Sequence, residues 1–384
     1  MNEAFTIAAT APDTRAEALA AAYERAGYRR IAPAVLQPAE PFLDLSGEDI
    51  RKRMYLTSDP YGRELCLRPD LTIPVSRDYL ASAAAGTPAG YCYLGAVFRH
   101  REDGPCEFLQ AGIESFGRGD TAATDAEMLA LGLEAAAHYG VKAPEIRMGD
   151  VGLFAALVAA LDLAPAWKRR LIKDFNRKKN LAQDLERLTL ATANGQAEYQ
   201  GVLAALAGAD PKGAHELVTD LLSIAGITAV GGRSVDEIAD RFLEQAALGA
   251  ATSLPRETRQ AIERFLAISG DPDDVAAKLR ELAGEAAVAA LNPAVDLLEQ
   301  RTGFLAARGV DVARIRFSTA FGRGVDYYTG FEFELHDPKT GGDEPLVAGG
   351  RYDGLLTRLG AKAPIPAVGF AAWIERLAAS GGAR

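Results

Sequence analysis

Four residues at alternate positions, Phe108, Gln110, Gly112 and Glu114, could build a small polar site. If residues 107–116 form a strand, these side chains share one face, because side chains alternate along an extended chain. A glycine between an amide and a carboxylate then leaves a hollow floored by backbone. The pattern predicts a pocket for a small polar ligand. A solvent-exposed sheet face with paired polar residues would give the same pattern, so this strand alone leaves both interpretations open.

Charged and aromatic residues elsewhere could complete the pocket. Arg99 ends an apolar run, Asp70 follows Pro69 on a turn, and segments 323–330 and 349–354 combine glycines with arginine and tyrosine. Taken singly, an arginine at a strand end is usually solvated, and Asp70 would more often cap a helix. Together they offer an acid for an ammonium, an arginine for a carboxylate, and a glutamate with tyrosines for a polar ring. A free amino acid requires that set.

Short β-type runs position these residues near both ends of the chain, at 64–68, 91–99, 107–116, 315–318, 331–335 and 346–350. We expect 91–99 and 107–116 to pair antiparallel, because the loop between them is short. Residues 31–45 are punctuated by prolines, which predicts extended chain. Capping-box spacing predicts helices over about 15–26 and from Thr124 to Gly140.

The middle of the chain, about 150–310, is rich in Ala and Leu with helical periodicity and no clear strand. We therefore predict an α+β fold, an antiparallel sheet flanked by helices, built from residues 1–145 and 312–384. An all-helical domain at 146–311 would be inserted into it. Within that insertion, residues 167–187 carry eight basic against three acidic side chains. This favours a solvated helix face or a protein contact.

Composition excludes several classes of protein. The net charge of 42 − 52 = −10 argues against a nucleic-acid partner or an anionic membrane surface. The most apolar stretch, 151–161, is too short to span a bilayer. The three cysteines fit neither a disulfide framework nor a zinc site, and the four histidines lack ligand spacing, so no metal site is predicted. With no basic, apolar leader after Met1, we expect a cytoplasmic protein.

Five segments resemble the histidyl-tRNA synthetase family of class II synthetases. Tyr93–Arg99 is similar to motif 2, Phe108–Glu114 to the substrate strand, Arg323–Tyr328 and Gly349–Asp353 to the two histidine signatures, and Val368–Leu377 to motif 3. The resemblance implies a class II synthetase-like core with a histidine pocket. By this resemblance Asp70 meets the ammonium and Arg323 the carboxylate. The full set of histidine-binding residues that it implies is Asp70, Thr72, Arg99, Gln110, Glu114, Arg323, Tyr327, Tyr328 and Tyr352.

The nucleotide half departs from the family pattern. Two residues after Arg99 the family has an acid that reads adenine, whereas this chain has Arg101. Three residues before Arg376 the family has glycine, whereas this chain has Trp373. An indole buries about 200 Å² and would occupy the space of a purine. Only 384 − 376 = 8 residues follow Arg376, so we expect no anticodon-binding domain.

A histidine pocket without nucleotide chemistry resembles the regulatory branch of this family, which serves ATP phosphoribosyltransferase in histidine biosynthesis. The resemblance implies no catalytic residues and no cofactor. It implies free histidine as the ligand and a short catalytic ATP phosphoribosyltransferase subunit as the partner. That subunit would require this chain for its activity and would be feedback-inhibited by histidine through it. The resemblance also implies a homodimer, formed through motif 1 within residues 15–60, inside a hetero-oligomer. Two alternatives stay open: an adenylating enzyme, which Arg99 and Arg376 favour, and an interaction protein with a relic pocket.

Overall fold

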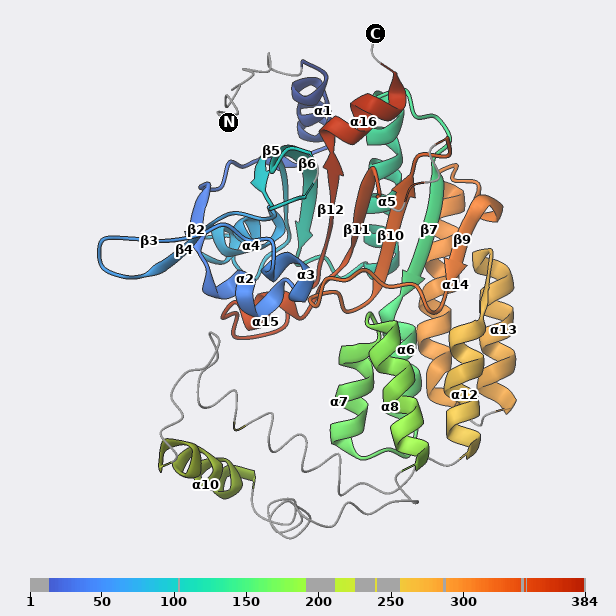
Figure 1. Cartoon of the computed structure of the whole chain (residues 1–384). Helices are drawn as coiled ribbons and strands as arrows, with labels where there is room; N and C mark the ends of the chain where they lie inside the picture. Colours follow the sequence, from blue (N-terminus) through green and yellow to red (C-terminus); the bar gives the residue numbers. More distant parts are fainter. Residues whose placement is uncertain are drawn as a thin grey trace.

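The computed structural model describes residues 14–102, 104–190, 211–224, 239, 256–285, 288–339, 342 and 344–382. Its centre is a nine-stranded sheet in the order β1-β5-β6-β12-β11-β10-β7-β9-β8 (Figure 1). The strands are Arg29–Arg30 (β1), Ala89–Phe98 (β5), Glu107–Phe116 (β6), Ala367–Trp373 (β12), Val347–Arg351 (β11), Phe331–His336 (β10), Glu145–Asp150 (β7), Ile315–Ser318 (β9) and Ser269–Gly270 (β8). All pairs are antiparallel except β1 with β5 and β7 with β9.

A smaller sheet, in the order β2-β4-β3, stands beside the β5 side of the large one (Figure 1). Its strands are Leu36–Pro38 (β2), Glu64–Leu67 (β4) and Leu56–Ser58 (β3). Leu36, Leu56 and Tyr61 expose large apolar surfaces on and next to these strands. The small sheet therefore leaves an apolar surface uncovered in the single chain.

The described helices either flank the large sheet or belong to the helical segment 146–311 (Figure 1). They are α1 (Thr14–Arg25), α2 (Glu40–Leu45), α3 (Glu48–Arg51), α4 (Thr72–Leu80), α5 (Thr121–His138), α6 (Val151–Ala160), α7 (Pro165–Asp174), α8 (Lys178–Leu190), α10 (Pro211–Ile224), α12 (Arg256–Ala267), α13 (Pro272–Glu285), α14 (Asn292–Ala307), α15 (Leu355–Arg358) and α16 (Ile374–Gly381). Among the described helices, none combines the length and the apolarity that crossing a bilayer requires. The predicted α+β class, a largely antiparallel sheet flanked by helices, is confirmed.

The sheet separates two apolar cores, because side chains alternate along its strands. On strand β6, the third in the sheet order, Ala111 and Ile113 face a core shared with α1, α5 and α14. Phe108 and Phe116 face the other core, shared with α2, α4 and α15. Alternation places Gln110 on the second face, so the predicted polar pocket lies between β6 and the helices α2 and α4.

The helical segment shares the first of these cores with the sheet. Phe154 on α6 lies 4.8 Å from Phe175 and 5.8 Å from Phe265, measured between ring centroids, and all three belong to the cluster that contains Phe333 of β10. Strand β7, at 145–150, crosses the predicted domain boundary after residue 145 and lies inside the large sheet. The division into 1–145 with 312–384 and 146–311 stays a prediction.

Three local predictions are wrong. Residues 40–45 are helical rather than extended, and Pro41 lies in the first turn of α2, where a proline forfeits no hydrogen bond. Helix α5 begins at Thr121, not at Thr124, whose hydroxyl instead donates to the carbonyl of Asp120 over 2.9 Å. The helical segment also contains a strand, because β8 pairs with β9 at the edge of the sheet.

The basic segment 167–187 forms ion pairs within the chain. Arg170 Nε lies 2.7 Å from carboxylate oxygens of both Asp174 and Asp184. Arg177 Nη2 lies 2.7 Å from Asp326, just before the tyrosines of the predicted site. These aspartates neutralise part of the positive charge of the segment 167–187.

Candidate functional site

A small cavity of about 50 Å³ lies on the β6 face that is covered by α2, α3 and α4. Eight of the nine predicted histidine-binding residues line it: Asp70, Thr72, Arg99, Gln110, Arg323, Tyr327, Tyr328 and Tyr352. Backbone and apolar side chains complete the wall, among them Ile50, Gly369 and Trp373. Segments more than 200 residues apart in the sequence therefore meet at one site.

Glu114, the ninth predicted residue, lies behind this wall and is fully buried. Its Oε1 accepts hydrogen bonds from Thr72 Oγ1 at 2.8 Å and from Tyr93 Oη at 3.3 Å, and its Oε2 accepts one from Tyr352. Burial raises the pKa of Glu114 to about 8, and these hydrogen bonds only partly oppose the rise. Glu114 thus holds two cavity residues, Thr72 and Tyr352, in place.

Gly369 makes room for that carboxylate. It pairs with Glu114 across β12 and β6, and a Cβ on it would clash with Glu114 Oε2 and lie 2.5 Å from the carbonyl oxygen of Ile113. Real Cβ atoms do not approach other atoms so closely, so any side chain at this position would displace the glutamate. The glycine is a steric requirement of the site.

Two hydrogen-bond acceptors in the cavity wall have no partner among the described residues. Asp70 caps α4 by accepting the Ile73 amide at Oδ1 over 3.1 Å, but its Oδ2 is buried and unpaired. Gln110 Oε1 is buried and unpaired in the same way. Burial raises the pKa of Asp70, and the nearby charge of Arg99 opposes that rise. Unpaired buried acceptors are costly, so the site suits a ligand that donates hydrogen bonds, such as an ammonium.

Two guanidinium groups line the cavity in different ways. Arg99 donates its Nε to the carbonyl of Pro69 over 2.6 Å, and no hydrogen bond from its terminal nitrogens is present within the described chain. Burial lowers the pKa of Arg99 to about 10. Arg323 instead donates Nη1 to Tyr328 Oη over 2.8 Å and Nε to Glu334 Oε1 over 3.1 Å. Arg99 therefore has more donors left for a carboxylate than Arg323, to which the resemblance assigned that role.

Carboxylates that the sequence analysis missed hold Arg323. Glu332 is fully buried on β10 and accepts the Arg323 amide at Oε2 over 2.8 Å. Burial raises the pKa of Glu332 to about 8. Burial lowers the pKa of Arg323, but the Tyr328 phenol and the Glu334 carboxylate outweigh it, so the pKa lies above its usual value. The alternation of 331–335 places both glutamates on one face, and this signal could have revealed them.

Tyrosines form the remaining wall. The ring of Tyr327 lies 5.0 Å from that of Tyr328 and 5.7 Å from that of Tyr352. The hollow predicted over Gly112 is not open, however, because the hydroxyl of Tyr93 fills it and a Cβ on Gly112 would clash with that hydroxyl. Tyr93 pairs with Gly112 across β5 and β6. Tyr93 is not among the predicted site residues, although the register of the predicted hairpin would have placed it opposite Gly112.

The indole of Trp373 stands in the part of the site where a purine was predicted not to fit. Trp373 lines the cavity, is buried, and pairs with Gln110 across β12 and β6. The guanidinium of Arg376 lies 5.0 Å from the centre of its ring. The guanidinium of Arg101 covers Phe108 at 3.9 Å. Both arginines near the expected nucleotide half thus face an aromatic ring of the chain itself.

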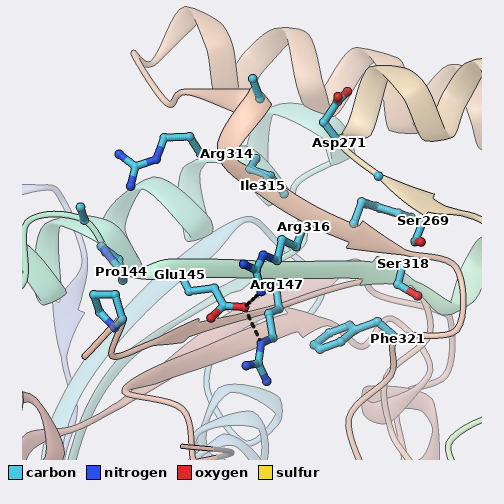
Figure 2. Close-up of a pocket in the computed structure, with 15 residues that line it drawn as sticks. Pro144, Glu145, Arg147, Ser269, Asp271, Arg314, Ile315, Arg316, Ser318 and Phe321 are labelled. Atoms are coloured by element: carbon cyan, nitrogen blue, oxygen red, sulfur yellow. Dashed lines mark hydrogen bonds and ion pairs between the residues drawn. The ribbon is translucent and has the colours of Figure 1, made fainter. Parts of the chain in front are cut away.

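A larger hollow, of about 840 Å³, lies at the β9 edge of the sheet and contains none of the predicted residues (Figure 2). Its central charges pair with one another, since Glu145 Oε1 accepts hydrogen bonds from Arg147 over 3.1 Å and from Arg316 over 2.7 Å. None of its lining side chains carries an unpaired buried polar atom in the described part of the chain. Size alone therefore does not make it the stronger candidate. The described residues also contain no cluster of histidine, cysteine and acidic groups that could hold a metal ion.

Comparisons with known proteins identify the family of this chain. The family model of histidyl-tRNA synthetase matches residues 8–231 and 213–377. An ATP phosphoribosyltransferase regulatory subunit from Mesorhizobium japonicum is 42% identical over 351 residues, 90% of this chain and 91% of its own length. One from Brucella canis is 41% identical over 349 residues, 91% of this chain and 92% of its own length. This chain belongs to the family of ATP phosphoribosyltransferase regulatory subunits.

Solved structures show the same fold. A structure described as an ATP phosphoribosyltransferase regulatory subunit/histidyl-tRNA synthetase from Bacillus halodurans superposes with a TM-score of 0.63 at 21% identity, covering 96% of this chain and 78% of that one. A histidine–tRNA ligase subunit from Alicyclobacillus acidocaldarius superposes with a TM-score of 0.56 at 25% identity, covering 96% and 94%. The predicted resemblance to the regulatory branch of a class II synthetase family is confirmed.

Proposed function

We propose that this chain is a non-catalytic subunit that binds free histidine and, when histidine is bound, lowers the activity of a short catalytic ATP phosphoribosyltransferase subunit. The name of the relatives supports a regulatory role. We infer the ligand from the cavity wall. There, unpaired oxygens of Asp70 and Gln110 lie near the unsatisfied donors of Arg99. A zwitterion matches these groups, and the tyrosine wall suits a polar ring.

Binding would require the cavity to enlarge. A volume of about 50 Å³ is room for roughly three to five waters at 10–15 Å³ each. Histidine is larger, so it has to displace part of the wall. One long wall segment without regular structure is the loop at 323–330, which carries Tyr327 and Tyr328. A ligand that favours one arrangement of this loop shifts the population toward it, and such coupling is typically about 1–3 kcal/mol.

Assembly is part of the proposal. We expect a homodimer inside a hetero-oligomer with the catalytic chain, with no membrane contact and no nucleic acid. The exposed Leu36, Leu56 and Tyr61 lie within or next to the segment 15–60 in which motif 1 was predicted, and they offer an apolar surface for a second copy. The cytoplasmic location stays a prediction.

Two measurements test the function. Calorimetry of the purified chain with histidine should give saturable binding, and addition of the chain to a short catalytic subunit should raise ATP phosphoribosyltransferase activity that histidine then lowers. The adenylating alternative, which Arg99 and Arg376 favour, predicts ATP–pyrophosphate exchange in the presence of histidine. Robust exchange would contradict the non-catalytic proposal. The interaction-protein alternative predicts neither exchange nor histidine binding.

A further inference from the structure

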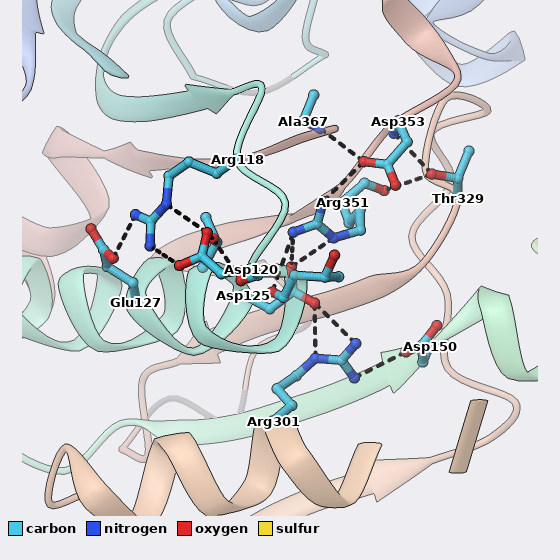
Figure 3. Close-up of polar contacts among 12 residues, drawn as sticks. Arg118, Asp120, Asp125, Glu127, Asp150, Arg301, Thr329, Arg351, Asp353 and Ala367 are labelled. Atoms are coloured by element: carbon cyan, nitrogen blue, oxygen red, sulfur yellow. Dashed lines mark hydrogen bonds and ion pairs between the residues drawn. The ribbon is translucent and has the colours of Figure 1, made fainter. Parts of the chain in front are cut away.

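Four charged side chains meet in the interior between the sheet and the helical segment (Figure 3). Asp125 belongs to α5, Asp150 ends β7, Arg301 belongs to α14 and Arg351 ends β11. Arg301 and Asp125 are fully inaccessible to solvent. Two positive and two negative groups therefore neutralise one another away from water. None of the four lines the candidate cavity.

Arg301 connects the two acids. Its Nη1 donates to Asp150 Oδ2 over 2.9 Å, and its Nε donates to Asp125 Oδ2 over 3.0 Å. The other oxygen of Asp125 accepts the Nε of Arg351 over 2.8 Å. The guanidinium also lies 4.7 Å from the centre of the Phe331 ring. The fork geometry of arginine suits two acids at once, and a lysine could not reproduce it.

Arg351 extends the network to the two tyrosine-bearing segments of the cavity. Its Nη1 donates to Asp353 Oδ1 over 3.0 Å, and the same oxygen accepts the Ala367 amide over 2.8 Å. The Asp353 amide in turn donates to Thr329 Oγ1 over 3.0 Å. Figure 3 shows Thr329 and Asp353 at the end of the network. Thr329 follows Tyr328 and Asp353 follows Tyr352 in the chain, so the network ends directly beside the cavity wall.

The other end of the network lies on the helical segment. Helix α14, which carries Arg301, packs between α5 and α13. Asp150 also caps α6, since its Oδ1 accepts the Gly152 amide over 2.8 Å. A shift of α14 or α6 would therefore move Asp125 and Arg351 through direct hydrogen bonds.

We propose that Arg301 is a positioning residue for the amino-acid cavity. It holds Asp125 and Asp150, and through Asp125 it sets the position of Arg351 and of the segments 327–330 and 351–354. The inference rests on the proposed function, because positioning matters for binding only if the cavity takes an amino acid. It goes beyond that function by giving the helical segment a part in ligand affinity.

The test uses the full chain and three variants. R301K keeps the charge but loses the fork, and D150N removes one acid while asparagine still caps α6. For both we expect the histidine dissociation constant, measured by calorimetry, to rise roughly tenfold, which corresponds to about 1.4 kcal/mol. Hydrogen exchange should show lower amide protection in 327–330 and 351–354, with unchanged protection in the β5–β6 hairpin. R280K is the control, because Arg280 pairs with Asp296 and Glu299 of α14 on the surface, at 2.5 and 2.7 Å, outside the network.

The outcomes are distinguishable. Wild-type affinity and wild-type loop protection in R301K and D150N would overturn the inference and leave the proposed function intact. An equal loss of protection throughout the core would also overturn it, because that result describes a purely structural ion pair. If the wild-type chain binds no histidine, the proposed function fails. The exchange comparison without ligand then still decides whether Arg301 positions the two segments. Should R301K fail to fold, D150N carries the test.

Discussion

The guanidinium carbon of Arg376 lies 5.0 Å from the centre of the Trp373 indole, so the two side chains cover one another. Arg376 also donates to the carbonyl of Pro345 over 2.9 Å and pairs with Glu344 at 2.7 Å. Trp373 is packed into the core that surrounds the cavity. One face of the Arg376 guanidinium, on which a purine could stack, is therefore already occupied by the chain itself.

Replacing this tryptophan should open the space. We expect W373A to bind ATP measurably in equilibrium dialysis, whereas the wild-type chain does not, because the face of Arg376 becomes free. The variant should lose about 3–5 kcal/mol of unfolding free energy in chemical denaturation, as is usual for a buried tryptophan.

W167A is the matched control for that experiment. Trp167 and Trp373 are both 6% exposed, but Trp167 lies on α7, away from the cavity. It should lose comparable stability without gaining nucleotide binding. Nucleotide binding by the wild-type chain, or its absence in a folded W373A, would show that Trp373 does not block the site.

The charge of Asp70 should matter for the ligand more than for the fold. Asparagine caps helices about as well as aspartate, so D70N keeps the hydrogen bond to Ile73 while removing the charge that faces the cavity. We expect histidine affinity to fall by roughly tenfold or more, in line with about 1.5–3 kcal/mol for a hydrogen bond to a charged group. The unfolding free energy should not fall, because the cap is kept and a buried carboxylate oxygen without a partner is removed.

Asp271 offers the control for this substitution. Its Oδ1 accepts the amides of Asp273 and Asp274 at 3.1 and 3.0 Å at the start of α13, outside the cavity. D271N should therefore leave histidine affinity unchanged. Equal affinity in D70N and the wild type would mean that Asp70 serves only as a cap.

Stability should decrease as the pH rises through the neutral range. Burial raises the pKa of Glu114 and of Glu332 to about 8, above the ordinary value of 4.5. Folding therefore favours the protonated carboxyls, and this contribution is fully present below about pH 4.5 and lost as the pH approaches 8. Chemical denaturation at several pH values should show the decline, and E114Q should reduce its slope because glutamine cannot ionise. A profile of E114Q parallel to that of the wild type would contradict the assignment to Glu114.

Gly369 should tolerate no side chain. In G369A the new Cβ would meet Glu114 and lie 2.5 Å from the Ile113 carbonyl oxygen, so we expect a loss of about 1–3 kcal/mol in unfolding free energy and weaker histidine binding. G303A is the control, because Gly303 lies within α14 and a Cβ there would meet no atom within 4 Å. It should gain about 0.5–1 kcal/mol, since alanine favours a helix more than glycine does. Equal stability of the two variants would contradict the packing argument.

Much of the fold followed from local patterns. Alternation identified β6 and β10, the short connection identified the β5–β6 hairpin, and helical periodicity identified the middle of the chain. The patterns failed where one residue type can mark two different structures. A proline can interrupt a helix, but Pro41 lies in the first turn of α2. A threonine can begin a helix, but Thr124 lies inside α5. Local propensity is a weak prior that tertiary packing overrides.

The sequence by itself determined the residue types that we propose for an amino-acid site and the family to which the chain belongs, because those types and their spacing are written along the chain. Only the tertiary structure decided that Glu114 stands behind the cavity and that Arg301 reaches two acids far from it in sequence. Such facts depend on strand register and on the packing of α14 against α5. Both are settled by contacts between distant segments, which no local pattern encodes.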